Sequence, residues 1–223
     1  GGLLHRAAGR GRSVLAVTVC AAPPPLGDLS DYAARLHARW GASDGAAAAE
    51  MVARRRAEDE AALALLGVAG EFLDVPDAIY RRDPDTGAWL YVGHGGIFGA
   101  LAAAETPLVH ALAAQLASLP GVRRTTRVLA PLGLGGHVDH QLVRHAAEEA
   151  WGSCGLRYYE DFPYAEDDAA LARVLGRDDA PRDAATHARA SLGADADPPG
   201  EGASVVGCDR ESSGVGRGGF ETR

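Results

Sequence analysis

A short apolar segment that runs into a glycine loop and then into a helix constrains this chain more than any other feature. The apolar pattern predicts a buried strand at residues 126–131, and three glycines follow within residues 133–136. A helix is then predicted at residues 139–151, because its apolar side chains fall on one face. Glycine permits positive φ angles and close approach of the backbone, and Asp139 is placed to cap the helix. Ligands bind at such strand-to-helix junctions in open α/β sheets, because a rigid scaffold holds the loops there.

Two histidines and a carboxylate, His137, Asp139 and His140, lie at this junction. The residues alone leave two interpretations open. In the first, a capping aspartate lies between two surface histidines and no function is involved. In the second, one imidazole binds a metal ion, while the carboxylate orients the other imidazole, fixes its tautomer and raises its basicity.

Strands and helices alternate along the rest of the chain. Apolar runs predict strands at residues 13–20, 71–75, 126–131 and 156–159. Apolar faces at helical spacing, together with caps and breakers, predict helices near residues 30–40, 45–66, 106–119, 139–151 and 167–175. Because strand, helix and strand follow one another, we expect an α/β domain with a mostly parallel sheet and right-handed crossovers.

The helix predicted at residues 45–66, with Ser43 or Asp44 as its cap and Gly67 at its end, carries three arginines that each precede an acid by four residues. These pairs are Arg54 with Glu58, Arg55 with Asp59, and Arg56 with Glu60. Each such pair is worth only about 0.2–0.5 kcal/mol, and the arginine-first order is the weaker one. The residues alone therefore favour a solvated face of ion pairs over a binding site.

Composition limits the kinds of partner. The formal net charge of -8 and the isoelectric point near 5.4 argue against nucleic acid and anionic membranes, since both require a basic surface, and leave small molecules. Cys20, Cys154 and Cys208 have no metal-binding or redox spacing, and the sequence contains neither a membrane-length apolar run nor a signal segment. We therefore expect a cytoplasmic protein, and its oligomeric state is open.

The composition changes near residue 176. The 223 residues, 47% of them hydrophobic, suit one domain with a substantial core. Beyond Gly176, Gly, Asp, Arg, Ser, Ala and Pro dominate, which predicts a disordered low-complexity tail over residues 176–223. Residues 1–175 are expected to form the folded domain.

Three stretches, in order along the chain, resemble one known family. Residues 131–144 (Pro-Leu-Gly-Leu-Gly-Gly-His-Val-Asp-His-Gln-Leu-Val-Arg) resemble the second motif of the LmbE/PIG-L family of zinc-dependent de-N-acetylases. Residues 54–67 are similar to its Arg-x-x-Glu helix, and residues 158–164 (Tyr-Tyr-Glu-Asp-Phe-Pro-Tyr) are similar to its Tyr-Glu-Asp-x-Pro-Tyr segment. The resemblance covers residues 1–175 and implies a Rossmann-like, three-layer α/β fold.

One part of the family's pattern is missing from the sequence. In the family, the Gly-Gly-Leu-Leu helix, here residues 1–4, follows a first strand and a His-Pro-Asp-Asp-Glu motif that supplies two metal ligands and the general base. Neither is present here. Loss of an interior strand removes about 8–15 kcal/mol of apolar burial, which equals the whole stability of a domain, about 5–15 kcal/mol. The chain as written is therefore expected to be an inactive fragment of a longer enzyme.

The resemblance implies roles for four residues. His140 would bind Zn²⁺, with another divalent metal as the alternative. His137 would stabilise the oxyanion as an imidazolium and protonate the departing amine. Asp139 would orient His137, and Arg55, held by Glu58, would contact polar groups of the substrate. The implied reaction is hydrolytic removal of an N-acetyl group from an N-acetylglucosamine-type conjugate.

Two other functions compete with this hydrolase. A non-catalytic relative that binds a sugar or a partner would keep the fold without the metal site, and the missing motif favours it. A dinucleotide-binding oxidoreductase ranks third, because no glycine fingerprint joins a strand to a helix.

Overall fold

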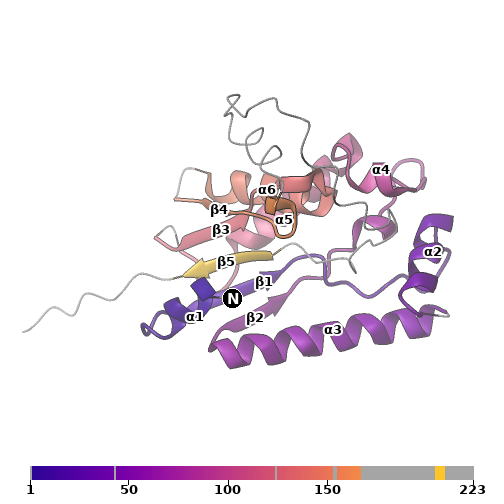
Figure 1. Ribbon diagram of the computed structural model, residues 1–223. Coiled ribbons are helices and arrows are strands. Elements are labelled where there is room, and N and C mark those ends of the chain that lie inside the picture. The colour runs from indigo at the N-terminus through magenta and orange to yellow at the C-terminus, as the bar shows by residue number, and fades with distance from the viewer. Residues whose placement is uncertain (1, 43, 124, 153–154, 167–203, 209–223) are drawn as a thin grey trace, which may run out of the picture.

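The computed structural model describes residues 2–42, 44–123, 125–152, 155–166 and 204–208. Within these ranges, five strands form one sheet in the order β2-β1-β5-β3-β4 (Figure 1). The strands are β1 (Val14–Thr18), β2 (Ala69–Phe72), β3 (Arg127–Pro131), β4 (Arg157–Tyr159) and β5 (Ser204–Cys208). β1 pairs with β2 and β3 pairs with β4 in parallel, whereas β5 is antiparallel to both β1 and β3. The α/β class is confirmed, but the described sheet is mixed rather than mostly parallel.

Two of the described helices, α2 (Asp31–Arg39) and α3 (Gly45–Leu66), begin at predicted capping residues. The other described helices are α1 (Gly2–Ala8), α4 (His94–Ile97), α5 (Thr106–Ala117) and α6 (Val138–Trp151). Short 3-10 turns are η1 (Ala78–Tyr80), η2 (Ala103–Glu105), η3 (Leu134–Gly136) and η4 (Tyr164–Glu166). The side chain of Ser30 accepts the N–H of Ala33 at the start of α2, and that of Asp44 accepts the N–H of Ala47 at the start of α3. Gly67 ends α3 in the left-handed conformation, with φ 69°.

Helices lie on both faces of the sheet. Figure 1 shows α5 and α6 on one side and α3 on the other, and α6 contacts β3 while α3 contacts β2. The main core joins the strands to the α5–α6 pair, and its most buried members include Val17, Val19, Leu116, Val128 and Leu142. The Rossmann-like three-layer arrangement stays a prediction in its details.

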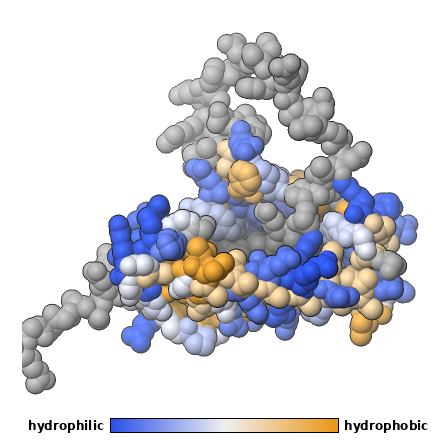
Figure 2. All heavy atoms as spheres, turned by 60° about the horizontal axis from the view of Figure 1, so that its bottom comes forward, coloured by the Kyte–Doolittle hydropathy of each residue, from blue (hydrophilic) through white to orange (hydrophobic). Residues whose placement is uncertain are grey.

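The helix α3 is long but buries little of its own surface. Only Ala48 and Met51 are buried among its described side chains, and the large side chain of Leu65 is 86% exposed. On the face that Figure 2 turns forward, hydrophilic and hydrophobic side chains lie next to one another over this part of the molecule. Because α3 has no continuous apolar stripe, its stability comes from its caps and helix-forming residues more than from packing.

The strand β5 corrects one part of the expected tail. Residues 176–223 were predicted to be disordered, but Ser204–Cys208 form a strand between β1 and β3, in the middle of the sheet. The segment reads Ser-Val-Val-Gly-Cys, and its β-branched pair favours extended backbone. The ladders of β1 and β3 present unpaired N–H and C=O groups toward this position, which a strand from anywhere in the chain can satisfy. The rest of the predicted tail, and the helix predicted at 167–175, lie outside the described residues.

Element boundaries differ from the predicted ones by a few residues. The strand predicted at 71–75 is β2, Ala69–Phe72, and the chain then continues by hydrogen bonds from Leu73 to Thr18 and from Ala22 to Val75. This extension lies outside the regular ladder, although Leu73 and Val75 stay buried as predicted for strand residues. In the part of the chain that the structure describes, no helix has the length and apolar character needed to cross a bilayer.

Candidate active site

The loop between β3 and α6 holds the two histidines in place. Gly133, Gly135 and Gly136 have φ angles of 81°, 78° and 75°, as expected of a glycine loop. At Gly135 a Cβ atom would lie 2.4 Å from the ring of Tyr164, so only glycine allows the loop to approach that ring. Gln141 closes the loop, because its Nε2 donates to the carbonyl oxygen of Gly136 at 2.7 Å.

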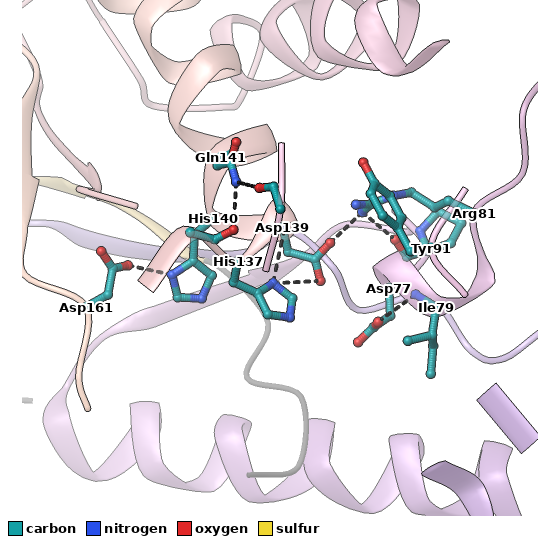
Figure 3. Close-up of polar contacts among 12 residues, drawn as sticks. Asp77, Ile79, Arg81, Tyr91, His137, Asp139, His140, Gln141 and Asp161 are labelled. Carbon is teal, nitrogen blue, oxygen red and sulfur yellow. Dashed lines mark hydrogen bonds and ion pairs between the residues drawn. The ribbon is translucent and has the colours of Figure 1, made fainter. Parts of the chain in front are cut away.

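His140 lies buried in the first turn of α6, and Asp161 orients its ring. Nδ1 of His140 is 2.6 Å from Oδ1 of Asp161, while Oδ2 of the same buried carboxylate accepts the N–H groups of Gly133 and Leu134 at 2.8 and 2.9 Å. Figure 3 shows Asp161 on the side of His140 that is remote from Asp139. A carboxylate at Nδ1 leaves Nε2 as the ligand nitrogen, which is the usual arrangement of a metal-binding histidine.

His137 occupies the N-cap of α6, the position predicted for Asp139. Its Nδ1 accepts the backbone N–H of Asp139 at 3.2 Å, so a neutral His137 carries its proton on Nε2. The carboxylate Oδ2 of Asp139 is 3.9 Å from that Nδ1, too far for a hydrogen bond. The predicted cap was therefore wrong, and Asp139 contacts His137 by its backbone N–H. The ring centroids of His137 and His140 are 5.6 Å apart (Figure 3).

The carboxylate of Asp139 is drawn away from the helix start by Arg81. Both side chains are buried, and Oδ1 of Asp139 is 2.6 Å from Nη1 of Arg81. Nε of Arg81 lies 2.5 Å from Oε1 of Glu105, whose other oxygen accepts the hydroxyl of Tyr91. Burial is the largest single influence and works against the charge of Arg81, but Asp139, Cys20 and Glu105 together outweigh it and raise the pKa of Arg81 above its ordinary value. A buried ion pair of this kind outcompetes a backbone N–H for the carboxylate.

A pocket lies between α3 and the carboxyl ends of β1 and β2. Its lining combines aromatic, cationic and acidic side chains, chiefly Trp40, Arg55, Arg56, Asp59, Asp77 and Tyr80, over a wall that includes Cys20 and Met51. Burial raises the pKa of the Cys20 thiol, with Asp139 adding to the effect, and a thiol that stays protonated is a poor nucleophile. A partly apolar pocket with a small number of convergent polar groups is typical of a small-molecule binding site.

In the described part of the chain, none of the three predicted pairs of α3 lies within ion-pair distance, although the charge of Arg55 opposes the rise in the pKa of Asp59. Among the described residues, Arg56 lies 3.8 Å from Asp74 rather than beside Glu60. The guanidinium of Arg55 lies 5.5 Å from the ring of Trp40, and that of Arg56 lies 5.1 Å from the ring of Phe72. The aromatic rings of Trp40, which follows α2, and Phe72, in β2, attract these side chains toward the pocket. Arg55 is therefore placed in the pocket, and the predicted support from Glu58 is not formed among the described contacts.

Asp77 connects the pocket to the histidine loop. Its Oδ1 accepts the N–H of Ile79 at 3.1 Å, and its charge interacts with both Asp139 and Arg55. Burial, and then the neighbouring Asp139, raise the pKa of Asp77 to about 7. At neutral pH this carboxyl is close to half protonated, so it can donate or accept a hydrogen bond in the pocket.

The raised pKa of Asp77 predicts that the protein loses stability as the pH rises. Between about pH 4 and about pH 7 the native carboxyl keeps a proton that the unfolded chain has released, so the free energy of unfolding falls over this range. Asp77→Asn, which cannot ionise, is expected to be more stable than the wild type at about pH 8 by roughly 1–3 kcal/mol. Urea unfolding at several pH values measures the difference, which should shrink toward about pH 4. An equal difference at all pH values would contradict the assignment, and the exposed Asp85→Asn serves as the control.

Sequence reasoning missed two residues that organise this site. Asp161 lies inside the Tyr158–Tyr164 segment that carries the family resemblance, so that segment contained the signal. Arg81 is followed by another arginine, Arg82, which is exposed and contacts Trp89. Nothing in the sequence distinguishes the two, because only the packing of the chain shows which guanidinium is buried against Asp139.

The described residues do not complete a metal site. Within them, no group of three or more His, Cys, Asp and Glu side chains is arranged to hold a metal ion. His140 has the orientation of a metal ligand, and catalytic zinc needs three protein ligands with one position open. The chain's own described residues therefore offer one well-oriented ligand.

Three solved structures similar to this chain are named as deacetylases. The zinc-inhibited form of teicoplanin deacetylase Orf2 is 35% identical, with a TM-score of 0.60 over 74% of this chain and 63% of that chain. A deacetylase–teicoplanin complex is 26% identical, with a TM-score of 0.63 over 96% and 93% of the two chains. The A40926 pseudoaglycone deacetylase Dbv21 is 27% identical, with a TM-score of 0.54 over 79% and 72%. This chain thus spans less than two thirds of the length of the first of them.

No curated protein matches the chain. The family model named PIG-L, GlcNAc-PI de-N-acetylase, matches residues 1–151, a span that includes α3, the glycine loop, both histidines and the whole of α6. With 151 of 223 residues matched, the chain belongs to the PIG-L family of GlcNAc-PI de-N-acetylases.

Proposed function

We propose that this chain forms the histidine half of a metal-dependent N-deacetylase that hydrolyses the acetamide of an N-acetylglucosamine-type conjugate. The observation that carries the proposal is the pair of imidazoles at the start of α6. Asp161 leaves Nε2 of His140 free for a metal, and the Asp139 N–H leaves a proton on Nε2 of His137. The similar structures named for teicoplanin and a pseudoaglycone support a glycoconjugate as the substrate class.

The metal would be Zn²⁺, with another divalent cation as the alternative, and His140 would be one of its ligands. When bound, such a metal polarises the acetamide carbonyl and acidifies a water molecule. In the family, a His-Pro-Asp-Asp-Glu motif supplies the other two ligands, and the 223 residues do not contain it. We therefore propose that residues 1–223 alone bind Zn²⁺ weakly and are inactive.

His137 would act directly on the substrate. Its Nε2–H would donate a hydrogen bond to the oxyanion that forms when water attacks the carbonyl. To protonate the departing amine, His137 would have to carry a second proton on Nδ1, so that it gives up its Nε2 proton as an imidazolium and returns to a neutral ring. The neighbouring ring of Phe98, with a centroid 5.1 Å away, limits rotation of the imidazole. Hydrogen-bond donation to the oxyanion therefore needs no movement of the histidine away from its cap position.

Arg55 and the pocket around it would bind the sugar. Its guanidinium is already held against Trp40, and Asp77 and Tyr80 lie in the same pocket. The planar guanidinium of Arg55 and the carboxyl group of Asp77, whose pKa is raised, can hydrogen-bond the hydroxyl groups of a sugar from two sides. We place the deacetylase domain in residues 1–175, and the cytoplasmic location expected from the cysteines stays a prediction.

A non-catalytic sugar-binding protein is the second candidate. The observation that favours it is the incomplete set of metal ligands among the described residues. Such a protein would use the Arg55 pocket and would have no need of an oriented His140. The buried His140–Asp161 pair thus favours the enzyme, since a buried imidazole and carboxylate are costly to keep without a use.

The test is to place a family-like strand that ends in His-Pro-Asp-Asp-Glu ahead of Gly1. This protein is expected to release acetate from N-acetylglucosamine conjugates in the presence of Zn²⁺ and to lose that activity with a chelator. The same extension with Asn in place of both Asp residues is the matched control and should be inactive. A folded protein that binds the conjugate and Zn²⁺ but releases no acetate would overturn the deacetylase and leave the binding protein.

A further inference from the structure

Arg81 is the one described cation that joins the pocket segment to the start of α6. It follows directly after η1, which Asp77 caps, and its side chain is only 4% exposed. Three oxygen atoms lie close to the guanidinium. Oδ1 of Asp139 is 2.6 Å from Nη1, and the carbonyl oxygen of Pro76 is 3.2 Å from the same nitrogen. Oε1 of Glu105 is 2.5 Å from Nε. The close-up in Figure 3 shows Arg81 on the side of Asp139 that faces away from His140.

The ion pair between Arg81 and Asp139 determines which atom of Asp139 contacts His137. With Oδ1 bound to Arg81, Oδ2 stays 3.9 Å from Nδ1 of His137, and the backbone N–H of Asp139 takes its place at 3.2 Å. An N–H group can only donate, so Nδ1 must accept and the ring proton of a neutral His137 must be on Nε2. If the carboxylate were free to turn to Nδ1, it would accept a proton there and favour the opposite tautomer.

We propose that Arg81 is a positioning residue that sets the tautomer of His137 by holding the carboxylate of Asp139 away from Nδ1. The residue makes no contact with the reacting atoms and acts through Asp139. Its consequence for catalysis rests on the proposed function, because the Nε2–H of a neutral His137 would be the donor to the oxyanion. The tautomer itself does not depend on any activity.

An arginine suits this role better than a lysine. The guanidinium places Nε and Nη1 on two different carboxylates at once, those of Glu105 and Asp139. Glu105 is in turn held by the hydroxyl of Tyr91, which also accepts the N–H of Ala102. A single ammonium cannot reproduce both contacts in fixed directions. Glu105 therefore anchors the guanidinium while Nη1 controls Asp139.

The test reads the ring nitrogens of His137 directly by ¹⁵N NMR of the full chain, at about pH 8, where an ordinary imidazole is neutral. The wild type is expected to show a protonated Nε2 and an unprotonated Nδ1. Arg81→Met frees Asp139 and is expected to move the proton toward Nδ1. Arg81→Met combined with Asp139→Asn removes the competing carboxylate and should restore the wild-type pattern. Arg82→Met, at the exposed neighbour, should change nothing.

An unchanged His137 tautomer in a folded Arg81→Met protein would overturn the proposal. If that variant does not fold, Arg81→Gln is measured instead, because it removes the charge and keeps a polar side chain, and an unchanged tautomer there has the same meaning. In the active protein carrying the His-Pro-Asp-Asp-Glu strand, Arg81→Met should lower kcat by roughly tenfold or more with little change in KM. Failure of the proposed function would remove this kinetic readout and leave the NMR result valid.

Discussion

Replacement of His140 by alanine is expected to abolish metal binding and deacetylase activity together, whereas His137→Ala should keep the metal and lower turnover by roughly 10²–10⁴-fold. Both changes are made in the protein that carries the His-Pro-Asp-Asp-Glu strand. The difference follows from the ring nitrogens: Asp161 holds Nδ1 of His140 and leaves Nε2 for a metal, while Nδ1 of His137 accepts a backbone N–H. Asp139→Asn should fall between the wild type and His137→Ala, because it alters only the surroundings of that imidazole.

Zinc calorimetry and steady-state kinetics on the same samples measure this pair of effects. His145→Ala is the matched control, because His145 is on the same helix with a side chain that is 51% exposed, and it should leave both quantities unchanged. Equal turnover with and without His137, in a protein that binds zinc, would show that the loop serves the metal alone. Arg55→Ala should instead raise KM, since Arg55 is expected to contact the substrate away from the scissile bond.

Asp161→Ala is expected to lower the free energy of unfolding by about 3–5 kcal/mol, because it leaves several buried groups without their partner. The carboxylate accepts two backbone N–H groups of the glycine loop and holds His140, and its side chain is fully buried. Since a domain has about 5–15 kcal/mol in total, this one change removes a large part of its stability. Urea unfolding followed by tryptophan fluorescence gives the value.

The controls for Asp161 separate charge from shape. Glu160→Ala changes an exposed acid next to it in the chain and should alter stability by less than about 0.5 kcal/mol. Asp161→Asn keeps the volume and one acceptor oxygen, so its loss should be smaller than that of alanine. A loss below about 1 kcal/mol for Asp161→Ala would show that water replaces the carboxylate and that the loop does not depend on it.

The local elements could be predicted because their causes are local. Asp44 and Gly67 cap α3 at the predicted ends, and the glycines of residues 133–136 take the left-handed conformation that no other residue adopts easily. The strand β3 and the helix α6 lie within one residue of their predicted starts. The family resemblance, which rested on these stretches, was confirmed by the match over residues 1–151.

What the sequence determined by itself was thus the set of elements, the glycine turn and the family, since each depends on residues close together in the chain. The tertiary structure alone decided which partners the polar side chains take. Asp139 was predicted to cap α6, but Arg81, 58 residues earlier, takes its carboxylate and leaves the cap to His137. In the same way Asp161 reaches back to His140, and β5 enters the sheet between β1 and β3. Buried charges and open strand edges must find partners, and distance along the chain does not limit which partner satisfies them.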